Sequence, residues 1–154
     1  MAAIVARFFL VNPVTTGFTI TDPFNSPRPY ANGRHEGIDL RANHGGQPAE
    51  IVAAQTGVVD RIKGGDTGYG NYVRLRHDWA DGVTWYTWYA HLSTIQPALQ
   101  TGQMVEIGQR LGTAGQTGNR SDAGGPGSGR NPREVQHRAT ARKRSASGSG
   151  PVEP

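Results

Sequence analysis

The sequence predicts an all-β fold, and three observations support that prediction. The 154 residues include 22 glycines and 10 prolines, a composition that favours many turns and short strands. Between residues 4 and 118, short runs rich in β-branched and aromatic residues alternate with glycine-containing stretches. The sequence has no apolar stripe of helical length at 3.6-residue spacing. A sandwich or barrel of short strands is therefore expected.

Seven segments carry the strand pattern, and the clearest is the alternation at 72–76. There Val73 and Leu75 are expected to point inward and Arg74 and Arg76 outward, as in a sheet with one solvated face. Turn-forming sequence such as Gly64-Gly65-Asp66-Thr67-Gly68 separates neighbouring segments. In chain order, the predicted strands cover residues 8–11, 37–40, 51–54, 57–62, 72–76, 83–91 and 103–107.

The chain changes character after Gly118. Residues 1–118 carry nine basic and nine acidic side chains, whereas 119–154 carry seven basic and three acidic ones, so the net charge of +4 lies in the tail. The only branched aliphatic residues of the tail are Val135 and Val152, too little apolar surface to offset the entropy lost on ordering. We expect an N-terminal strand or linker remnant at 1–15, a folded domain at 16–118 and a disordered basic tail at 119–154.

The segment His35-Glu36-Gly37-Ile38-Asp39 has the pattern of a metal site. If the segment is extended, side chains two apart share a face, so His35 and Asp39 point the same way and Gly37 leaves space between them. Imidazole and carboxylate are ligands of catalytic zinc, which uses three protein ligands and an open position for water. Two of the three are present here. Taken alone, a pair of this kind is more often a surface histidine and a strand-end aspartate.

The absence of cysteine narrows the chemistry. Disulfides, thiolate metal sites and a cysteine nucleophile are all excluded, so any metal must be held by His, Asp, Glu or Asn. The apolar run at 2–11 is too short to cross a bilayer, and no other segment approaches the roughly 20 apolar residues of a transmembrane helix. We expect a soluble chain with no export signal of its own.

The run Trp85-Tyr86-Thr87-Trp88-Tyr89 is dense in aromatic residues. Strand alternation places Tyr89 and His91 on one face and Trp88 on the other. Two interpretations of Tyr89 stay open. It is either a core residue or part of a groove wall on which a peptide or sugar lies.

The order of several motifs over residues 16–118 resembles the lysostaphin-type (LytM-like) zinc endopeptidases, which cut the peptide cross-bridges of peptidoglycan. Several motifs in the right order are far more specific than any one of them alone. The segments that carry the resemblance are Phe24-Asn25-Ser26-Pro27-Arg28, His35-Glu36-Gly37-Ile38-Asp39-Leu40, 51–59, Gly68-Tyr69-Gly70-Asn71 with the strand after it, Tyr89-Ala90-His91, and 102–112.

The resemblance implies a compact antiparallel β sandwich or barrel-like domain, built as a duplicated hybrid motif, with zinc at the floor of a groove. By the family pattern His35 and Asp39 are metal ligands and His91 is the catalytic histidine. Arg28 and Tyr30 resemble a substrate-side loop, although the motif before them is one residue longer than in the family. The implied partner is bacterial peptidoglycan peptide, and the implied location is extracellular, at the cell envelope or phage-borne. We expect a monomer.

One element of the family pattern is missing. The family has a histidine-x-histidine pair after a Thr-Gly-Asn-like turn, and its second histidine is the third zinc ligand. Gly115-Gln116-Thr117-Gly118-Asn119 is present, but the only later histidine is His137. We hypothesise that the reading frame slips near Pro126, so that 127–154 is out of frame or divergent. The sequence therefore predicts an enzyme whose activity is impaired.

Two alternatives compete with an enzyme. A non-catalytic module of the same fold would bind peptidoglycan or regulate a partner hydrolase. The basic run at 138–144 could bind phosphate non-specifically. The tail contains no Phe, Trp or Tyr that could stack on bases. We therefore expect no specific nucleic-acid partner.

Overall fold

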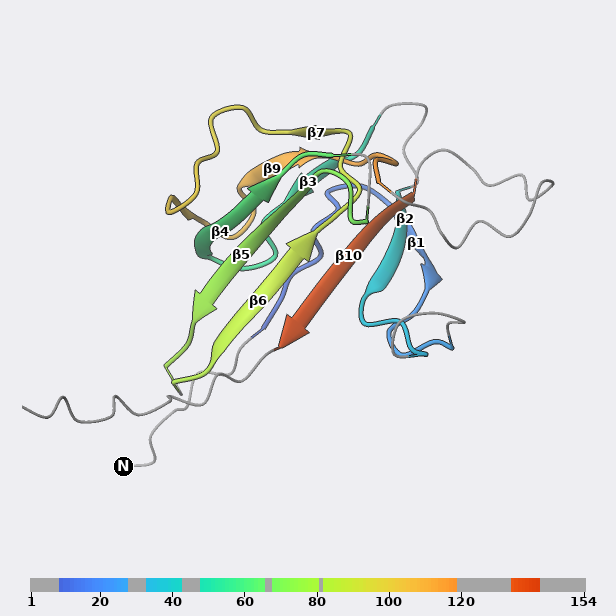
Figure 1. Cartoon of the computed structure of the whole chain (residues 1–154), viewed down its shortest axis with the longest axis horizontal. Coiled ribbons are helices and arrows are strands. Elements are labelled where there is room, and N and C mark those ends of the chain that lie inside the picture. Colours follow the sequence, from blue (N-terminus) through green and yellow to red (C-terminus); the bar gives the residue numbers. More distant parts are fainter. Residues whose placement is uncertain are drawn as a thin grey trace, which may run out of the picture.

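The computed structural model describes residues 9–27, 33–42, 48–65, 68–80 and 82–118, together with the backbone of 134–141. In these ranges all the regular structure is β-strand, and every strand pairing is antiparallel (Figure 1). The all-β prediction is therefore confirmed. The strands are β1 (Phe18–Asp22), β2 (Ile38–Ala42), β3 (Glu50–Val52), β4 (Gly57–Lys63), β5 (Tyr72–Asp78), β6 (Thr84–Tyr89), β7 (Thr94–Ile95), β8 (Met104–Val105), β9 (Arg110–Thr113) and β10 (Glu134–Ala141).

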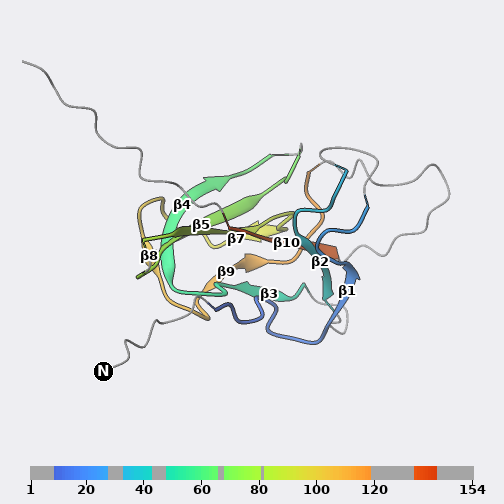
Figure 2. The same ribbon diagram turned by 90° about the horizontal axis from the view of Figure 1, so that it is seen from below.

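The strands form two sheets that enclose the core. The larger sheet has seven strands in the order β1-β2-β10-β6-β5-β4-β8, and the smaller has the order β3-β9-β7. Seen from below, β3 and β9 lie on one side of the layer that contains β5, β6 and β10 (Figure 2). The large sheet contributes Val59, Leu75 and Tyr89 to the core and the small sheet contributes Ile51 and Leu111, all of them fully buried. This packing is the predicted sandwich.

The alternation predicted for β5 is confirmed. Val73 and Leu75 are fully buried, whereas Arg74 and Arg76 lie on the other face, where Arg74 forms an ion pair with Asp60. The Arg74 guanidinium also lies over the Trp88 ring, 4.8 Å from its centroid. The polar face of the large sheet is thus partly covered by its own cation–π and ionic contacts.

Residues 11–15 run alongside β3 and join the core. The Val11 N–H donates to the Ala54 carbonyl at 2.9 Å, and the Val52 N–H donates to the Pro13 carbonyl at 2.9 Å. Val14 is only 3% exposed and pairs with Ile51 in an isolated bridge. Within the described part of the strand predicted at 8–11, residues 9–11 are not strand.

Strand β10 lies within the segment 119–154, which was predicted to be a disordered tail. Residues 134–141 pair with β2 on one side and with β6 on the other. The reason is that a strand between two others is held by backbone hydrogen bonds on both edges, which do not require apolar side chains. Residues 119–133 and 142–154, and with them most of the proposed out-of-frame segment, lie outside the described residues.

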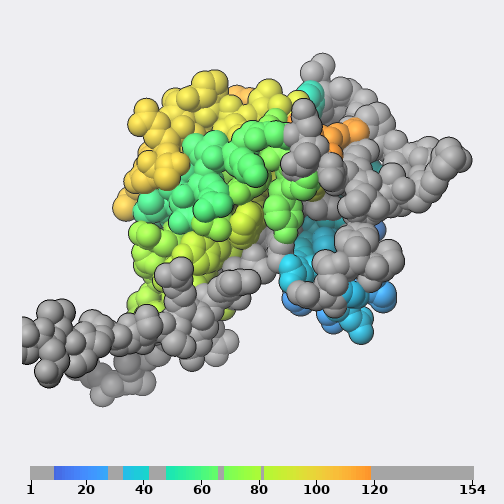
Figure 3. Space-filling model, in the orientation of Figure 1, coloured from blue at the N-terminus to red at the C-terminus, as the bar shows by residue number. Residues whose placement is uncertain are grey.

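The described residues 18–27 and 33–42, in blue to cyan, gather at one end of the molecule (Figure 3). The segment 84–110, in yellow to orange, covers much of the opposite end. Across the described ranges, the structure has no helix of the length and hydropathy that crossing a membrane requires.

Candidate functional site

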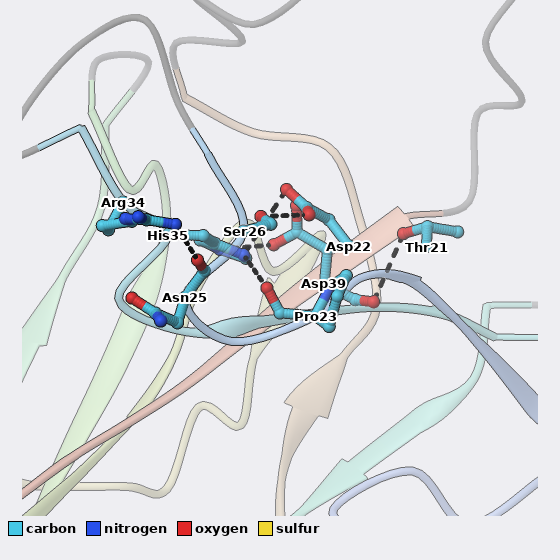
Figure 4. A network of polar contacts seen from close by, with 8 residues as sticks. All are labelled: Thr21, Asp22, Pro23, Asn25, Ser26, Arg34, His35 and Asp39. Atoms are coloured by element: carbon cyan, nitrogen blue, oxygen red, sulfur yellow. Dashed lines mark hydrogen bonds and ion pairs between the residues drawn. The ribbon is translucent and has the colours of Figure 1, made fainter.

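Three side chains that could hold a metal meet where β1 ends and β2 begins. Asp22 is the last residue of β1, Asp39 is the second residue of β2, and His35 lies in the segment just before β2. A register shift between Ile20 and Asp22 pairs Asp22 with Asp39 across the two strands. One potential ligand atom from each of the three lies within 4.8 Å of the others (Figure 4). We call Asp22, His35 and Asp39 the metal end of the site.

Contacts within the metal end fix the orientation of His35. Its Nε2 lies 3.2 Å from Asp39 Oδ1, and its Nδ1 lies 3.5 Å from Asp22 Oδ2 and 3.2 Å from the Pro23 carbonyl oxygen. The Ser26 hydroxyl donates to Asp22 Oδ1. These polar groups are drawn in Figure 4.

Backbone hydrogen bonds hold the His35 segment against the residues that follow β1. The Asn25 N–H donates to the His35 carbonyl at 2.7 Å, and the His35 N–H donates to the Ser26 carbonyl at 2.8 Å. His35 is therefore placed by main-chain pairing as well as by its side-chain contacts.

The metal end fits a divalent cation. Two carboxylates beside one imidazole disfavour each other's charged form unless a positive charge lies nearby. Asp39 is only 4% exposed, so solvent screens this repulsion poorly. One imidazole and carboxylate oxygens are donors that zinc accepts. His35 and Asp39 were predicted as ligands and do lie together. Asp22 was missed, because only the strand register brings it to them.

His91 occupies a second, separately built part of the site. It follows β6 with a positive φ of 56°, and its main-chain N–H donates to the Tyr69 carbonyl at 2.9 Å. The Nδ1 of its ring lies 2.6 Å from the Thr117 carbonyl oxygen. A carbonyl can only accept, so Nδ1 carries the proton, and the lone pair of the neutral imidazole is on Nε2.

Two glycine-containing loops form the support under His91, which we call the His91 cradle: residues 68–71 and Thr117-Gly118. Gly70 has a φ of 61°, and a Cβ there would lie 2.3 Å from the Thr117 carbonyl. The Asn71 N–H donates to Thr117 Oγ1 at 2.8 Å, and Thr117 Oγ1 donates to the Leu92 carbonyl at 2.9 Å. The cradle thus explains why glycine is required at Gly70.

The strand register relates the His91 cradle to the metal end. Residue 137 of β10 pairs with Ile38 on one side and with Tyr89 on the other, so Ile38 and Tyr89 are level across the sheet. Asp39 and His91 follow these residues and lie at the same end of the sheet. The strands β2 and β6 are separated by β10 and so lie two strand spacings apart, roughly 10 Å.

The register also bears on the missing third ligand. Residue 136 pairs with Asp39, whereas residue 137 pairs with Ile38. Paired residues share a face of the sheet. The backbone register thus pairs Asp39 with position 136 and not with position 137, the only histidine of β10.

Tyr89 is a core residue, the first of the two interpretations that the sequence left open, and not part of a groove wall. Its side chain is fully buried. The Ala54 N–H donates to its hydroxyl at 2.8 Å, and Thr87 Oγ1 lies 3.1 Å from the same oxygen. Burial raises the pKa of Tyr89 to about 12. A tyrosine whose hydroxyl finds its partners inside has no surface to offer a ligand.

Two other predicted contacts, Arg28 and Tyr30, lie outside the described residues. His77, which no motif required, is structural. Its Nδ1 donates to the Thr56 carbonyl at 2.8 Å, and its Nε2 lies 2.9 Å from Thr87 Oγ1. Burial lowers the pKa of His77.

Residues 33–127 match the family model described as Peptidase family M23. The chain is 30% identical over 107 residues to the L-Ala--D-Glu endopeptidase of Bacillus subtilis, a match that covers 69% of this chain and 30% of that protein. The chain thus spans less than a third of the length of this curated relative.

Solved structures agree with these sequence matches. A variant of the catalytic domain of the prophage-encoded M23 protein EnpA from Enterococcus faecalis is 26% identical with a TM-score of 0.58, covering 85% of each chain. The catalytic domain of the antimicrobial peptidase lysostaphin from Staphylococcus simulans is 25% identical with a TM-score of 0.55. That match covers 80% of this chain and 81% of the lysostaphin domain.

Proposed function

Because the chain belongs to Peptidase family M23, we propose that it is a zinc metalloendopeptidase domain that cleaves peptide cross-bridges of bacterial peptidoglycan. The observation that carries this proposal is the convergence of His35 and Asp39 at the end of the sheet where His91 also lies. The protein would be extracellular, either located at the cell envelope or carried by a phage.

The side chains divide into holding and proton-moving roles. His35 and Asp39 would hold the zinc ion. When bound, zinc supplies Lewis-acid chemistry that polarises a carbonyl and makes water acidic enough to attack it near neutral pH. His91, with Nδ1–H anchored on Thr117, would take a proton at Nε2 and deliver it to the leaving amine. The anchor keeps Nε2 in one direction throughout.

The choice of substrate rests on resemblance and on relatives. The motif order resembles enzymes that cut peptidoglycan cross-bridges, and the Bacillus subtilis relative is by name an L-Ala--D-Glu endopeptidase. Applied to this chain, the motif resemblance and the relative favour a peptide of the bacterial cell wall over an ordinary protein as the substrate.

The sequence also predicts that turnover is impaired. No histidine-x-histidine pair occurs anywhere in the chain. Losing a residue that only hydrogen-bonds to a zinc ligand costs roughly 10- to 100-fold in zinc affinity, so losing a ligand itself should weaken zinc binding by more than that. This observation favours a second candidate function, a non-catalytic module that binds peptidoglycan or regulates a partner hydrolase.

Zinc content and amine release separate the two functions. The purified full chain is loaded with zinc, dialysed and analysed for zinc per chain, and is then incubated with purified peptidoglycan while new amino groups are counted. The peptidase proposal predicts one zinc per chain and slow amine release that His91→Ala abolishes. Sedimentation with peptidoglycan, without zinc and without amine release, would instead establish the binding module. Asp60→Asn, which alters only an ion pair with Arg74, serves as the matched control.

A further inference from the structure

We propose that Asp22 is a positioning residue for His35: its carboxylate, on the Nδ1 side of the ring, keeps Nε2 beside Asp39, where the metal would bind. The inference rests on the proposed function, because it assigns zinc to His35 Nε2 and Asp39. It adds a residue that neither the motif pattern nor the family resemblance supplies. The ring contacts, the anchoring of Asp22 and the direction of its approach each support it.

The two nitrogens of His35 have different surroundings. Nδ1 lies 3.2 Å from the Pro23 carbonyl oxygen and 3.5 Å from Asp22 Oδ2. Nε2 lies 3.2 Å from Asp39 Oδ1. A ring nitrogen that faces a carbonyl must carry a proton to bond to it. Nε2 also faces an acceptor, but that acceptor is the proposed ligand Asp39, so a metal held by Asp39 would take the place of a proton on Nε2. Nδ1 would keep the proton that it donates to the Pro23 carbonyl.

Asp22 is itself held in place. Its backbone pairs with Asp39 at the end of β1, and the Ser26 hydroxyl donates to its Oδ1 (Figure 4). Its side chain is 25% exposed and that of His35 is 12% exposed, so solvent screens their attraction only in part. A carboxylate fixed in this way can hold the imidazole in one orientation and make it a stronger ligand.

A direct role for Asp22 as a third ligand fits the contacts less well. Asp22 approaches the ring at Nδ1, whereas Asp39 approaches it at Nε2. The lone-pair directions of the two nitrogens diverge across the ring. An ion shared by Nε2 and Asp39 would therefore lie away from the edge that Asp22 contacts. The contacts favour an outer carboxylate acting through the histidine.

The test compares zinc affinity of the full chain with that of Asp22→Asn, by competition against a chromophoric chelator. Asparagine has the same shape and keeps an oxygen for the Ser26 hydroxyl, so a purely structural role would be preserved. The positioning role predicts that zinc affinity falls about 10- to 100-fold. Asp60→Asn, the matched charge-removing control, should leave affinity unchanged. Equal affinity of Asp22→Asn and the wild type would overturn the inference.

A cobalt spectrum and an NMR measurement complete the test. With Co²⁺ in place of zinc, the visible absorption bands of Asp22→Asn should keep the wild-type shape; altered coordination would make Asp22 a ligand and overturn the inference. In the zinc-free protein, nuclear Overhauser contacts should place the His35 ring in one orientation in the wild type and in several in Asp22→Asn. This readout holds even if the wild type binds no zinc, a result that would refute the proposed function alone. An unchanged ring in Asp22→Asn would overturn the inference.

Discussion

The His91 cradle and the metal end each hold a histidine in place, but the cradle does so with backbone groups and the metal end with side chains. The cradle is made mainly of backbone: two loops with left-handed glycines approach closely, and carbonyls of Tyr69 and Thr117 fix the main chain and the ring of His91. The metal end is made of side chains, Asp22, His35 and Asp39, which orient one another at the junction of β1 and β2.

The His91 cradle and the metal end are therefore sensitive to opposite kinds of substitution. A backbone cradle fails when a side chain is added, because there is no room for a Cβ. A side-chain cluster fails when a group is removed, because each member keeps the others in place. Next to the metal end, the backbone of β10 pairs with Asp39 at position 136.

The largest expected effect is a gain at the metal end. Gln136→His would place an imidazole at the register partner of Asp39, on the same side of the sheet. A new protein ligand should strengthen zinc binding by more than about 100-fold, since even an outer partner is worth about 10- to 100-fold. Competitive titration of the full chain measures this change. Thr140→His, at the partner of Tyr86, is the control, and equal gains in both variants would refute the register argument.

The cradle should break when Gly70 becomes alanine. The new Cβ would lie 2.3 Å from the Thr117 carbonyl at a φ of 61°, so left-handed strain and overpacking together should cost about 2–3 kcal/mol. Gly82→Ala is matched, with a φ of 74° and no neighbour within 4 Å, and should cost only about 1 kcal/mol. Urea unfolding of both variants measures the difference. Equal losses would mean that the close approach is unimportant.

Removing the Tyr89 hydroxyl should cost less. Tyr89→Phe leaves the buried N–H of Ala54 without its acceptor, at about 1–2 kcal/mol of unfolding free energy. Tyr86→Phe changes a half-buried tyrosine on the other face of β6 and should stay within about 0.5 kcal/mol of the wild type. If the two variants were equally stable, the hydrogen bond to Tyr89 would contribute nothing.

The smallest effect is a pH dependence from His77. Burial lowers the pKa of His77 below its usual 6.5, so below pH 6.5 the unfolded chain takes up a proton that the folded one does not. The contribution of His77 to stability is therefore constant above pH 6.5 and is lost as the pH falls through the folded pKa. Urea unfolding at pH 7.5 and at pH 5 should show a steeper loss for the wild type than for His77→Gln. Parallel losses would contradict the assignment.

Alternation of buried and polar residues made some strands easy to predict, and its absence hid others. β5 was clear because buried and polar residues alternate. β1 was missed because Phe18 and Ile20 are exposed at the sheet edge, so their pattern has no buried face. β10 lies in the segment predicted to be disordered, and its backbone pairs with a strand on each edge, a feature that depends on long-range contacts and not on the local sequence.

The candidate site was predictable only in part for a related reason. His35 and Asp39 follow from a local spacing, whereas Asp22 is brought to them by a register shift between β1 and β2. Tyr89 carries a hydroxyl that suggests a wet surface, but its partners come from Thr87 and from a loop after β3. Long-range partners of this kind are set by tertiary packing and leave no mark in the local sequence.

The proposed roles are that the metal end holds zinc and that His91 moves protons. The most direct test of these roles is to measure zinc binding by His35→Ala and His91→Ala in the full chain. The metal end predicts that His35→Ala loses zinc by more than about 100-fold. The cradle predicts that His91→Ala keeps wild-type zinc affinity, because its histidine moves protons and does not hold the metal. Loss of zinc in His91→Ala, or its retention in His35→Ala, would contradict the account.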